Sequence, residues 1–295
     1  MTPPPRRRGA KRTTGAPSRG SRRDPRGKPR AGEGQARARR TDGPRGGSGL
    51  GGQQVEGRQA VRELLLAGRR RVYELWVTAD VAERGGVGDL IALAHDQRVP
   101  VQQVARKRLE AEARSEAPQG VLAKAAPLAE ADVDDLATGR RGAAPFLVLV
   151  DGVTDPGNLG ALLRSAEGAG VTGVVLPRHR AAHVTPTVAK AAAGAVEHLP
   201  IALVPGLPSA IERLRRKGIW VVGLDDAASA SLFDLSELAQ GPVALVLGAE
   251  GPGLSRLVRQ RCDLLVAIPM RGALSSLNVA ASAALACYEV ARHRA

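Results

Sequence analysis

The sequence predicts an α/β protein, and two observations favour a parallel sheet covered by helices as its main body. From residue 146 to the C-terminus, short apolar runs alternate with helical segments. Each run is apolar at consecutive positions, as strands buried on both faces require. No run of about 18 apolar residues occurs, so a membrane span is not expected.

The chain of 295 residues begins with a segment, residues 1–50, that is predicted to be a disordered basic tail. It holds 15 of the 43 Lys and Arg residues against three acidic ones, so it carries +12 of the net charge of +14. It contains no Phe, Tyr, Trp, Ile or Val from which a core could form. We interpret it as an electrostatic tether for a polyanion, because neutralising phosphates releases counterions. A tail that only solubilises the protein is the alternative.

The cysteines and the N-terminal residues together predict the cellular compartment of the protein. No apolar stretch follows the first basic residues, so no secretory signal is expected, and the many Pro and Gly residues disfavour an organellar transit peptide, the competing interpretation. Cys262 and Cys287 are too few for a disulfide framework and lie in no zinc-binding spacing. A cytoplasmic protein without a structural metal is therefore expected.

Residues 53–126 are predicted to form a small α/β domain. Val61, Leu64 and Leu65 share one face of its first helix. After that helix, strand-like and helical patterns alternate: a strand at 72–79, a helix at 89–97, a strand at 99–104, a short helix from 106 and a strand at 120–125. Residues 127–145 are polar and punctuated by Gly and Pro, as expected of a linker.

Residues 146–295 are predicted to form the larger domain, a doubly wound sheet. Its expected strands are 146–150, 173–176, 198–204, 218–224, 243–248 and 263–268. Its expected helices are 159–169, 186–195, 208–217, 254–261 and 277–292. Ligands of such sheets bind beyond the carboxyl ends of the strands. The loops after the first, fifth and sixth strands therefore form the candidate site.

The six aromatic residues are predicted to lie mainly in the core. Tyr73 and Trp76 belong to the small domain, where stacking on nucleic-acid bases is the alternative to core packing. The other four lie in apolar strand or helix contexts and are expected in the core: Phe146, Trp220, Phe233 and Tyr288.

The first candidate loop follows the strand at 146–150. Asp155, Pro156 and Gly157 form a turn, and Asn158 is placed to cap the next helix. On that helix Arg164 lies about 140° from the middle of the apolar stripe, so it points away from the core. A plain capping residue and a plain surface arginine are the alternatives.

The second candidate loop runs from Gly248 to Gly253 and contains Glu250. Glycines at a strand end let a ligand approach the backbone closely. The order of the glycines is not that of the dinucleotide fingerprint, and Pro252 removes one N–H group that could bind phosphate. Glu250 serving only to stabilise a helix N-terminus is the alternative.

The third candidate loop follows Pro269, and Ser275 or Ser276 is expected to begin the last helix. Ser276 as a plain cap and Asn278 as a plain first-turn residue are the alternatives. The helix carries an apolar stripe whose alanines permit close approach of another backbone or subunit. The stripe comprises Leu277, Ala281, Ala284, Leu285 and Tyr288.

Three segments, NLGALLR, LVLGAEGPGLS and IPMRGALSSLNVAASAA, resemble the three motifs of the SpoU/TrmH family of RNA 2′-O-ribose methyltransferases, in the SPOUT superfamily. This resemblance covers about residues 146–292. The segment 53–126, with EGRQAVRELL and PQGVLA, is similar to the L30e-like RNA-binding domain found in the ribosomal-RNA branch of the family.

The resemblance implies a homodimeric enzyme that uses S-adenosylmethionine and has a trefoil knot in its C-terminal domain. By motif position, the residues implied to bind the cofactor are Leu247, Gly248, Ile268, Met270, Leu277 and Asn278. Those implied in catalysis and RNA contact are Asn158, Arg164, Glu250, Ser276 and Asn278. The implied substrate is a guanosine of large-subunit (23S) ribosomal RNA.

The three motifs contain no histidine that could act as a general base. A guanidinium has no acceptor and stays protonated, so our hypothesis is that Arg164 binds the target phosphate and polarises the ribose O2′. A phosphate oxygen or water would then take the proton. Asn158 and Asn278 would orient the ribose, Ser276 would orient the loop, and Glu250 would balance the charge of Arg164 or of the sulfonium.

Three alternative functions remain open from the sequence. The same chemistry on tRNA is disfavoured by the N-terminal domain, and a non-catalytic RNA-binding or assembly protein by the intact motif residues. A nicotinamide-dependent oxidoreductase is disfavoured because its fingerprint is absent. His179 and His183, four residues apart, lack a third ligand at a suitable spacing, so surface histidines are preferred over a metal pair.

Overall fold

The computed structural model of the chain describes residues 49–83, 86–140 and 142–294. The predicted tail of residues 1–50 lies outside these ranges except for its last two residues. Within the described ranges, no helix combines the length and the apolar character needed to cross a bilayer.

The amino-terminal sheet has the strand order β1-β4-β2-β3 and is antiparallel except between β2 and β3. Its strands are β1 (Gln54–Glu56), β2 (Val72–Thr78), β3 (Val101–Val104) and β4 (Val121–Ala125). Its helices are α1 (Arg58–Ala67), α2 (Ala79–Glu83), α3 (Gly88–Asp96) and α4 (Arg106–Glu112). The predicted face of α1 is fully buried in the core of this sheet.

The two aromatic residues of β2 have different environments. Trp76 is 5% exposed and packs in a small apolar cluster, so its predicted core position is confirmed. Tyr73 is 50% exposed, so its predicted core position is wrong. The register of β2 against β4 shifts between Val72 and Glu74, and the extra residue of this bulge, Tyr73, is turned out of the strand's normal alternation.

The carboxy-terminal sheet is parallel throughout, in the order β7-β6-β5-β10-β8-β11-β9. Its strands are β5 (Phe146–Asp151), β6 (Gly173–Pro177), β7 (Ile201–Val204), β8 (Trp220–Leu224), β9 (Ala230–Ser231), β10 (Val243–Gly248) and β11 (Leu264–Ala267). The predicted parallel sheet is confirmed; the trefoil knot and the domain boundaries remain predictions.

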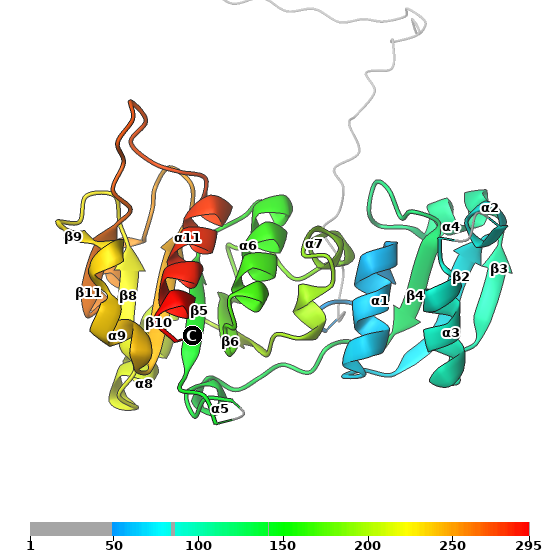
Figure 1. Cartoon of the computed structure of the whole chain (residues 1–295), viewed down its shortest axis with the longest axis horizontal. Helices are drawn as coiled ribbons and strands as arrows, with labels where there is room; N and C mark the ends of the chain where they lie inside the picture. The colour runs from blue at the N-terminus through cyan, green and yellow to red at the C-terminus, as the bar shows by residue number, and fades with distance from the viewer. Residues whose placement is uncertain (1–48, 84–85, 141, 295) are drawn as a thin grey trace, which may run out of the picture. The chain divides into compact units, whose positions relative to one another are not determined.

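Helices cover both faces of this sheet. Alternate residues of β5 therefore belong to two separate hydrophobic cores, one on each face. One core includes α6 (Pro156–Gly168), α7 (Pro186–Ala191) and α11 (Val279–Arg292), and Figure 1 shows α6 and α11 side by side. The other core includes α5 (Val133–Leu136), α8 (Leu207–Arg216) and α10 (Arg256–Arg261). The remaining helices are α9 (Ser236–Gln240), η1 (Ala195–Glu197) and η2 (Leu232–Asp234).

Phe146 is buried as predicted, but the core positions predicted for Trp220, Phe233 and Tyr288 are wrong, because about half of each residue is exposed. Trp220 is the first residue of β8 and lies at the open amino end of the sheet. Phe233 lies in the short helix η2, beside the edge strand β9. Tyr288 lies on the outward side of α11.

The outward side of α11 is the stripe that the sequence analysis singled out. Leu277, just before the helix, and Leu285 and Tyr288 on it are 37%, 42% and 54% exposed. The inward face is a second apolar stripe, made of smaller side chains that permit close packing on the sheet. It comprises Ala283, Ala286, Cys287 and Val290.

A buried ion pair joins the two sheets. Arg70 donates from Nε to Oε2 of Glu197 over 3.0 Å and from Nη2 to Oε1 over 2.5 Å. Both side chains are almost completely buried. Desolvation raises the pKa of Glu197, and the charge of Arg70 opposes that rise. The small sheet is therefore fixed to the large one by a specific polar contact as well as by packing.

Candidate active site

Side chains from the three predicted loops meet at the carboxyl ends of β5, β10 and β11. Nδ2 of Asn278 donates to Oε1 of Glu250 over 2.6 Å and to Oδ1 of Asn158 over 3.0 Å. Nδ2 of Asn158 also donates to Oε1 of Glu250 over 3.0 Å. We call Asn158, Glu250 and Asn278 the amide–carboxylate cluster. It brings together one residue from each motif.

The first loop presents Asn158 through a helix cap. Asp155, not Asn158 as predicted, caps α6: its Oδ1 accepts from the backbone N–H of Asn158 over 2.7 Å. Pro156 occupies the first turn, where its missing N–H costs nothing. Because Asp155 satisfies the helix end, the Asn158 side chain is free to join the amide–carboxylate cluster.

The third loop presents Asn278 as a cap. Its Oδ1 accepts from the backbone N–H of Ala280 over 2.8 Å, so Asn278 begins α11 and the predicted caps Ser275 and Ser276 are wrong. The amide oxygen of Asn278 accepts the capping hydrogen bond, and its amide nitrogen donates to Glu250 and Asn158. One side chain thus ends the loop and closes the cluster.

The second loop depends on Gly248 and on a contact that the sequence analysis missed. A Cβ at Gly248 would lie 2.3 Å from the carbonyl carbon of Gly253, so only glycine permits the backbone to fold back here. Oδ2 of Asp151, at the end of β5, accepts from the backbone N–H of Ser255 over 2.7 Å. This bond ties the second loop to the strand that precedes the first.

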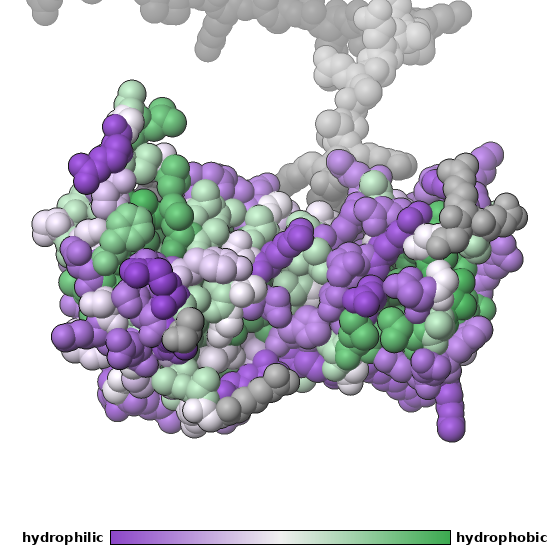
Figure 2. Space-filling model, viewed as in Figure 1, coloured by the Kyte–Doolittle hydropathy of each residue, from purple (hydrophilic) through white to green (hydrophobic). Residues whose placement is uncertain are grey.

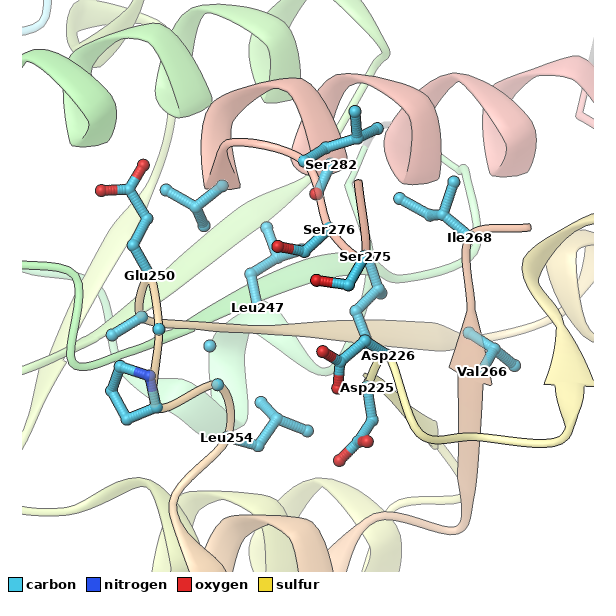
Figure 3. Close-up of a pocket in the computed structure, with 18 of the residues that line it drawn as sticks. Asp225, Asp226, Leu247, Glu250, Leu254, Val266, Ile268, Ser275, Ser276 and Ser282 are labelled. Atoms are coloured by element: carbon cyan, nitrogen blue, oxygen red, sulfur yellow. The ribbon is translucent and has the colours of Figure 1, made fainter. Parts of the chain in front are cut away.

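A cavity of about 210 Å³ lies beside Glu250. Its walls include five of the six predicted cofactor residues: Leu247, Gly248, Ile268, Met270 and Leu277. The sixth, Asn278, lies in the cluster next to it. Figure 3 shows Glu250 on one side of the cavity, with Asp225, Asp226 and Ser275 across from it.

Three residues that were not predicted from the sequence also line this cavity: Asp225, Asp226 and Arg259. Arg259 and Asp225 form an ion pair, with Nε 3.0 Å from Oδ2. The two aspartates directly follow β8, so the rule that sites lie beyond carboxyl ends of strands could have found them. Counting Glu250, the described residues that line the cavity include three carboxylates and one guanidinium, which favours a cationic ligand.

Two predicted residues stand apart from the amide–carboxylate cluster. Ser276 is exposed and lines the cavity. Arg164 is exposed and, among the described residues, forms no ion pair or side-chain hydrogen bond. It follows Asn158 by six residues on α6, which separates the two by about 9 Å along the helix and about 240° around it. The structure therefore unites Asn158, Glu250 and Asn278 and leaves Arg164 elsewhere on the surface.

The described residues contain no group of three or more His, Cys, Asp or Glu side chains that could hold a metal ion. His179 and His183 are both exposed, in the segment between β6 and α7.

Two family models match the protein that carries this site. The SpoU rRNA Methylase family model matches residues 145–288, and the model described as RNA 2′-O ribose methyltransferase substrate binding matches residues 54–131. The chain belongs to the SpoU methylase family, as the motifs predicted.

Two relatives and one solved structure show which members of this family the chain is similar to. The 23S rRNA (guanosine-2′-O-)-methyltransferase RlmB of Shewanella oneidensis is 40% identical over 243 residues, which cover 81% of this chain and 97% of the relative. RlmB of Pseudomonas aeruginosa is 40% identical over 245 residues, covering 82% and 97%. The solved structure of the SpoU methyltransferase AviRb from Streptomyces viridochromogenes, in complex with AdoMet, gives a TM-score of 0.67 at 28% identity and covers 82% of this chain and 90% of that one.

Proposed function

We propose that the protein is a ribose 2′-O-methyltransferase that transfers a methyl group from S-adenosylmethionine to a guanosine of 23S rRNA. The observation that carries the proposal is the amide–carboxylate cluster, which joins all three motifs beside a cavity whose lining includes three carboxylates. The relatives named for this reaction match over nearly their whole length, which supports the same substrate class. Such an enzyme would act in the cytoplasm.

The cavity residues fit the proposed cofactor. Leu247, Ile268 and Leu277 offer apolar walls for an adenine ring, and Gly248 lets the backbone of the second loop fold back beside them. Glu250 and Asp226 offer negative charge to the cationic groups of the cofactor. When bound, S-adenosylmethionine supplies an electrophilic methyl group; the side chains of this chain supply orientation and charge.

The amide–carboxylate cluster orients the ribose in this proposal. Methyl transfer needs the ribose O2′ in line with the methyl group, and misplacement by about 1 Å can cost about 100-fold in rate. Oε1 of Glu250 accepts from both asparagine amides, so the amides are held in one orientation before RNA arrives. A proton on O2′ would leave to a phosphate oxygen or water while Arg164 binds the target phosphate.

Arg164 meets this role when it comes from a second copy of the chain. It forms no hydrogen bond or ion pair with the amide–carboxylate cluster of its own chain among the described residues, and α6, which carries it, packs beside α11. The outward stripe of α11 is apolar, and Figure 2 shows apolar surface gathered near the loop that leads into this helix. We propose a homodimer that covers this face and in which Arg164 of each subunit serves the partner's site.

A subunit-mixing experiment tests the exchange of Arg164. Heterodimers of Arg164→Ala and Asn158→Ala subunits contain one intact site if Arg164 acts across the dimer and none if it acts within its own chain. With equal mixing after reversible dissociation, about a quarter of wild-type methylation should return. Recovery no greater than the sum of the two separate variants would contradict this arrangement.

The target is tested by mapping 2′-O-methylation across rRNA and tRNA in cells with and without the gene. We expect one guanosine of 23S rRNA to lose its methyl group and to regain it with wild-type protein but not with Asn158→Ala. A lost methyl group in tRNA instead would establish the alternative substrate. No lost methyl group in either RNA would overturn the proposed function.

A further inference from the structure

A groove of about 490 Å³ lies on the small sheet, outside the site described above. It is formed by the start of β2 and the turn between α3 and β3. Its lining residues include Arg71, Tyr73 and Arg98. We call it the β2 groove.

Tyr73 lies in the β2 groove with half of its surface exposed. The bulge between Val72 and Glu74 turns this side chain outward, whereas the next residues of β2 return to a buried pattern. The guanidinium carbon of Arg71 lies 5.5 Å from the centre of the Tyr73 ring. An aromatic ring and a guanidinium are thus held together at the surface, where each can contact a planar ligand.

Arg98 occupies a backbone position that favours glycine. Its φ is 57°, at the end of α3, where Arg98 N donates to His95 O and Val99 N donates to Ala94 O. Helices commonly end with a glycine in this left-handed conformation, and an L-residue there is strained. The chain thus carries a long cationic side chain into the groove at a position where a glycine would be favoured.

The positive charge of the β2 groove is not balanced locally. None of the described residues that line it is acidic. The charge of Arg70 is neutralised by Glu197, but among the described residues neither Arg71 nor Arg98 forms an ion pair. Two exposed guanidinium groups beside an exposed ring favour a ligand with both a planar face and a negative charge.

We propose that the β2 groove binds one unpaired nucleotide of the RNA substrate, with its base stacked on Tyr73 and its phosphate between Arg71 and Arg98. This inference rests on the proposed function. Unpaired RNA bases stack on aromatic rings and arginine planes, and their phosphates attract arginines. The groove is the subsite of the small domain that anchors RNA, separate from the methyl-transfer site.

The position of the groove defines what this anchor does. Nη1 of the neighbouring Arg69 donates to the carbonyl oxygens of Glu197 and Leu199, which precede β7 at the amino end of the large sheet. The amide–carboxylate cluster lies at the opposite, carboxyl end. The nucleotide in the groove is therefore remote from the one that is methylated, so the groove contributes to RNA affinity and not to the chemical step.

Tyr73 variants test the stacking contact. The measurement is the affinity of the full-length protein for a fluorescent 23S rRNA fragment with unpaired loops, together with KM and kcat for its methylation. Tyr73→Ala should raise Kd and KM about 5-fold to 100-fold and leave kcat unchanged. Tyr73→Phe keeps the ring and should stay within about threefold of wild type.

Arg98→Gly tests the phosphate contact without threatening the fold, because glycine suits the left-handed position. Its thermal unfolding temperature should match or exceed that of wild type. The slope of log Kd against log salt should fall by about 0.7, as expected for one lost phosphate contact on a single strand. Arg216→Ala removes one exposed charge from α8 instead and should leave the Kd for the fragment nearly unchanged.

The outcomes separate the groove from the proposed function. If wild type methylates the fragment but Tyr73→Ala and Arg98→Gly bind it as wild type does, the groove proposal is wrong and the function stands. If both variants lose affinity but no RNA is ever methylated, the groove binds RNA and the proposed function is wrong. A fall in kcat for Tyr73→Ala at unchanged KM would overturn the anchoring role.

Discussion

The two sheets of this protein hold their polar side chains in opposite ways. At the carboxyl end of the large sheet, Asn158, Glu250 and Asn278 are bonded to one another before any ligand arrives. In the β2 groove of the small sheet, Arg71 and Arg98 form no ion pair with any described residue. The first arrangement fixes geometry, and the second keeps charge available.

This difference matches the physical needs of the two tasks. Group transfer requires reacting atoms to be aligned, so side chains that are already bonded lose little entropy in the reaction. RNA anchoring depends on charge and stacking, which tolerate many local geometries. We therefore expect variants of the amide–carboxylate cluster to change the rate of methylation and variants of the β2 groove to change RNA affinity. Variants of the contact between the sheets should change the stability on which both depend.

The largest expected effect is on stability, at the contact between the sheets. Arg70→Ala leaves the buried carboxylate of Glu197 without its cation and should lower the free energy of unfolding by about 3–5 kcal/mol. Arg71→Ala, its exposed neighbour, should change it by no more than about 0.5 kcal/mol. Urea unfolding followed by circular dichroism measures both. Equal small losses would mean that the ion pair does not hold the sheets together.

The next effect, on rate, tests the amide–carboxylate cluster. Asn158→Ala removes one amide from the cluster but not the helix cap, which Asp155 provides. We expect kcat for RNA methylation to fall about 100-fold, because the ribose loses alignment. Cofactor affinity, measured by calorimetry, should stay close to that of wild type, and Glu167→Ala, exposed on the same helix, should act as wild type. Near wild-type kcat for Asn158→Ala would show that the cluster is not part of the machinery.

The sequence predicted the parallel sheet because strands buried on both faces are apolar at every position. It also located the three loops, since ligand sites follow the carboxyl ends of such strands. It did not distinguish the residues that cap the two helices, because Asp155 and Asn158, like Ser276 and Asn278, are all good caps in a short stretch. Which one accepts the backbone N–H depends on the path of the loop.

The spacing of apolar residues could not predict three other features of the structure. α11 is apolar on two sides, and only packing determines that the alanine-rich side faces the sheet while Leu285 and Tyr288 face outward. The bulge at Tyr73 adds one residue to a strand, and an extra residue leaves no mark in the composition. Trp220 is apolar in sequence context but exposed, because β8 begins there.

A third, smaller change tests the proposed dimer face on the large sheet. Leu285→Lys places a charge in the outward stripe of α11, where burial against a second copy would be unfavourable. Because Leu285 is 42% exposed in the single chain, the fold should persist while analytical ultracentrifugation reports a monomer. Leu66→Lys, on the exposed side of α1 in the small sheet, is the matched control and should remain a dimer. A dimeric Leu285→Lys variant would move the interface elsewhere.

The smallest effect concerns the two thiols, which lie at the end of α10 and in α11, two helices that cover the large sheet. Burial raises the pKa of Cys262 and of Cys287 to about 12. Each is therefore a neutral thiol at neutral pH, and the native protein should not react with a thiolate-selective reagent at pH 8, whereas both should react in urea. Because the folded pKa lies above the unfolded value, this contribution to stability is complete below about pH 8.5 and is lost as pH rises toward 12. Rapid labelling of Cys287 in the native state would show that α11 separates from the sheet. This result would contradict the fixed geometry that we assign to the large sheet.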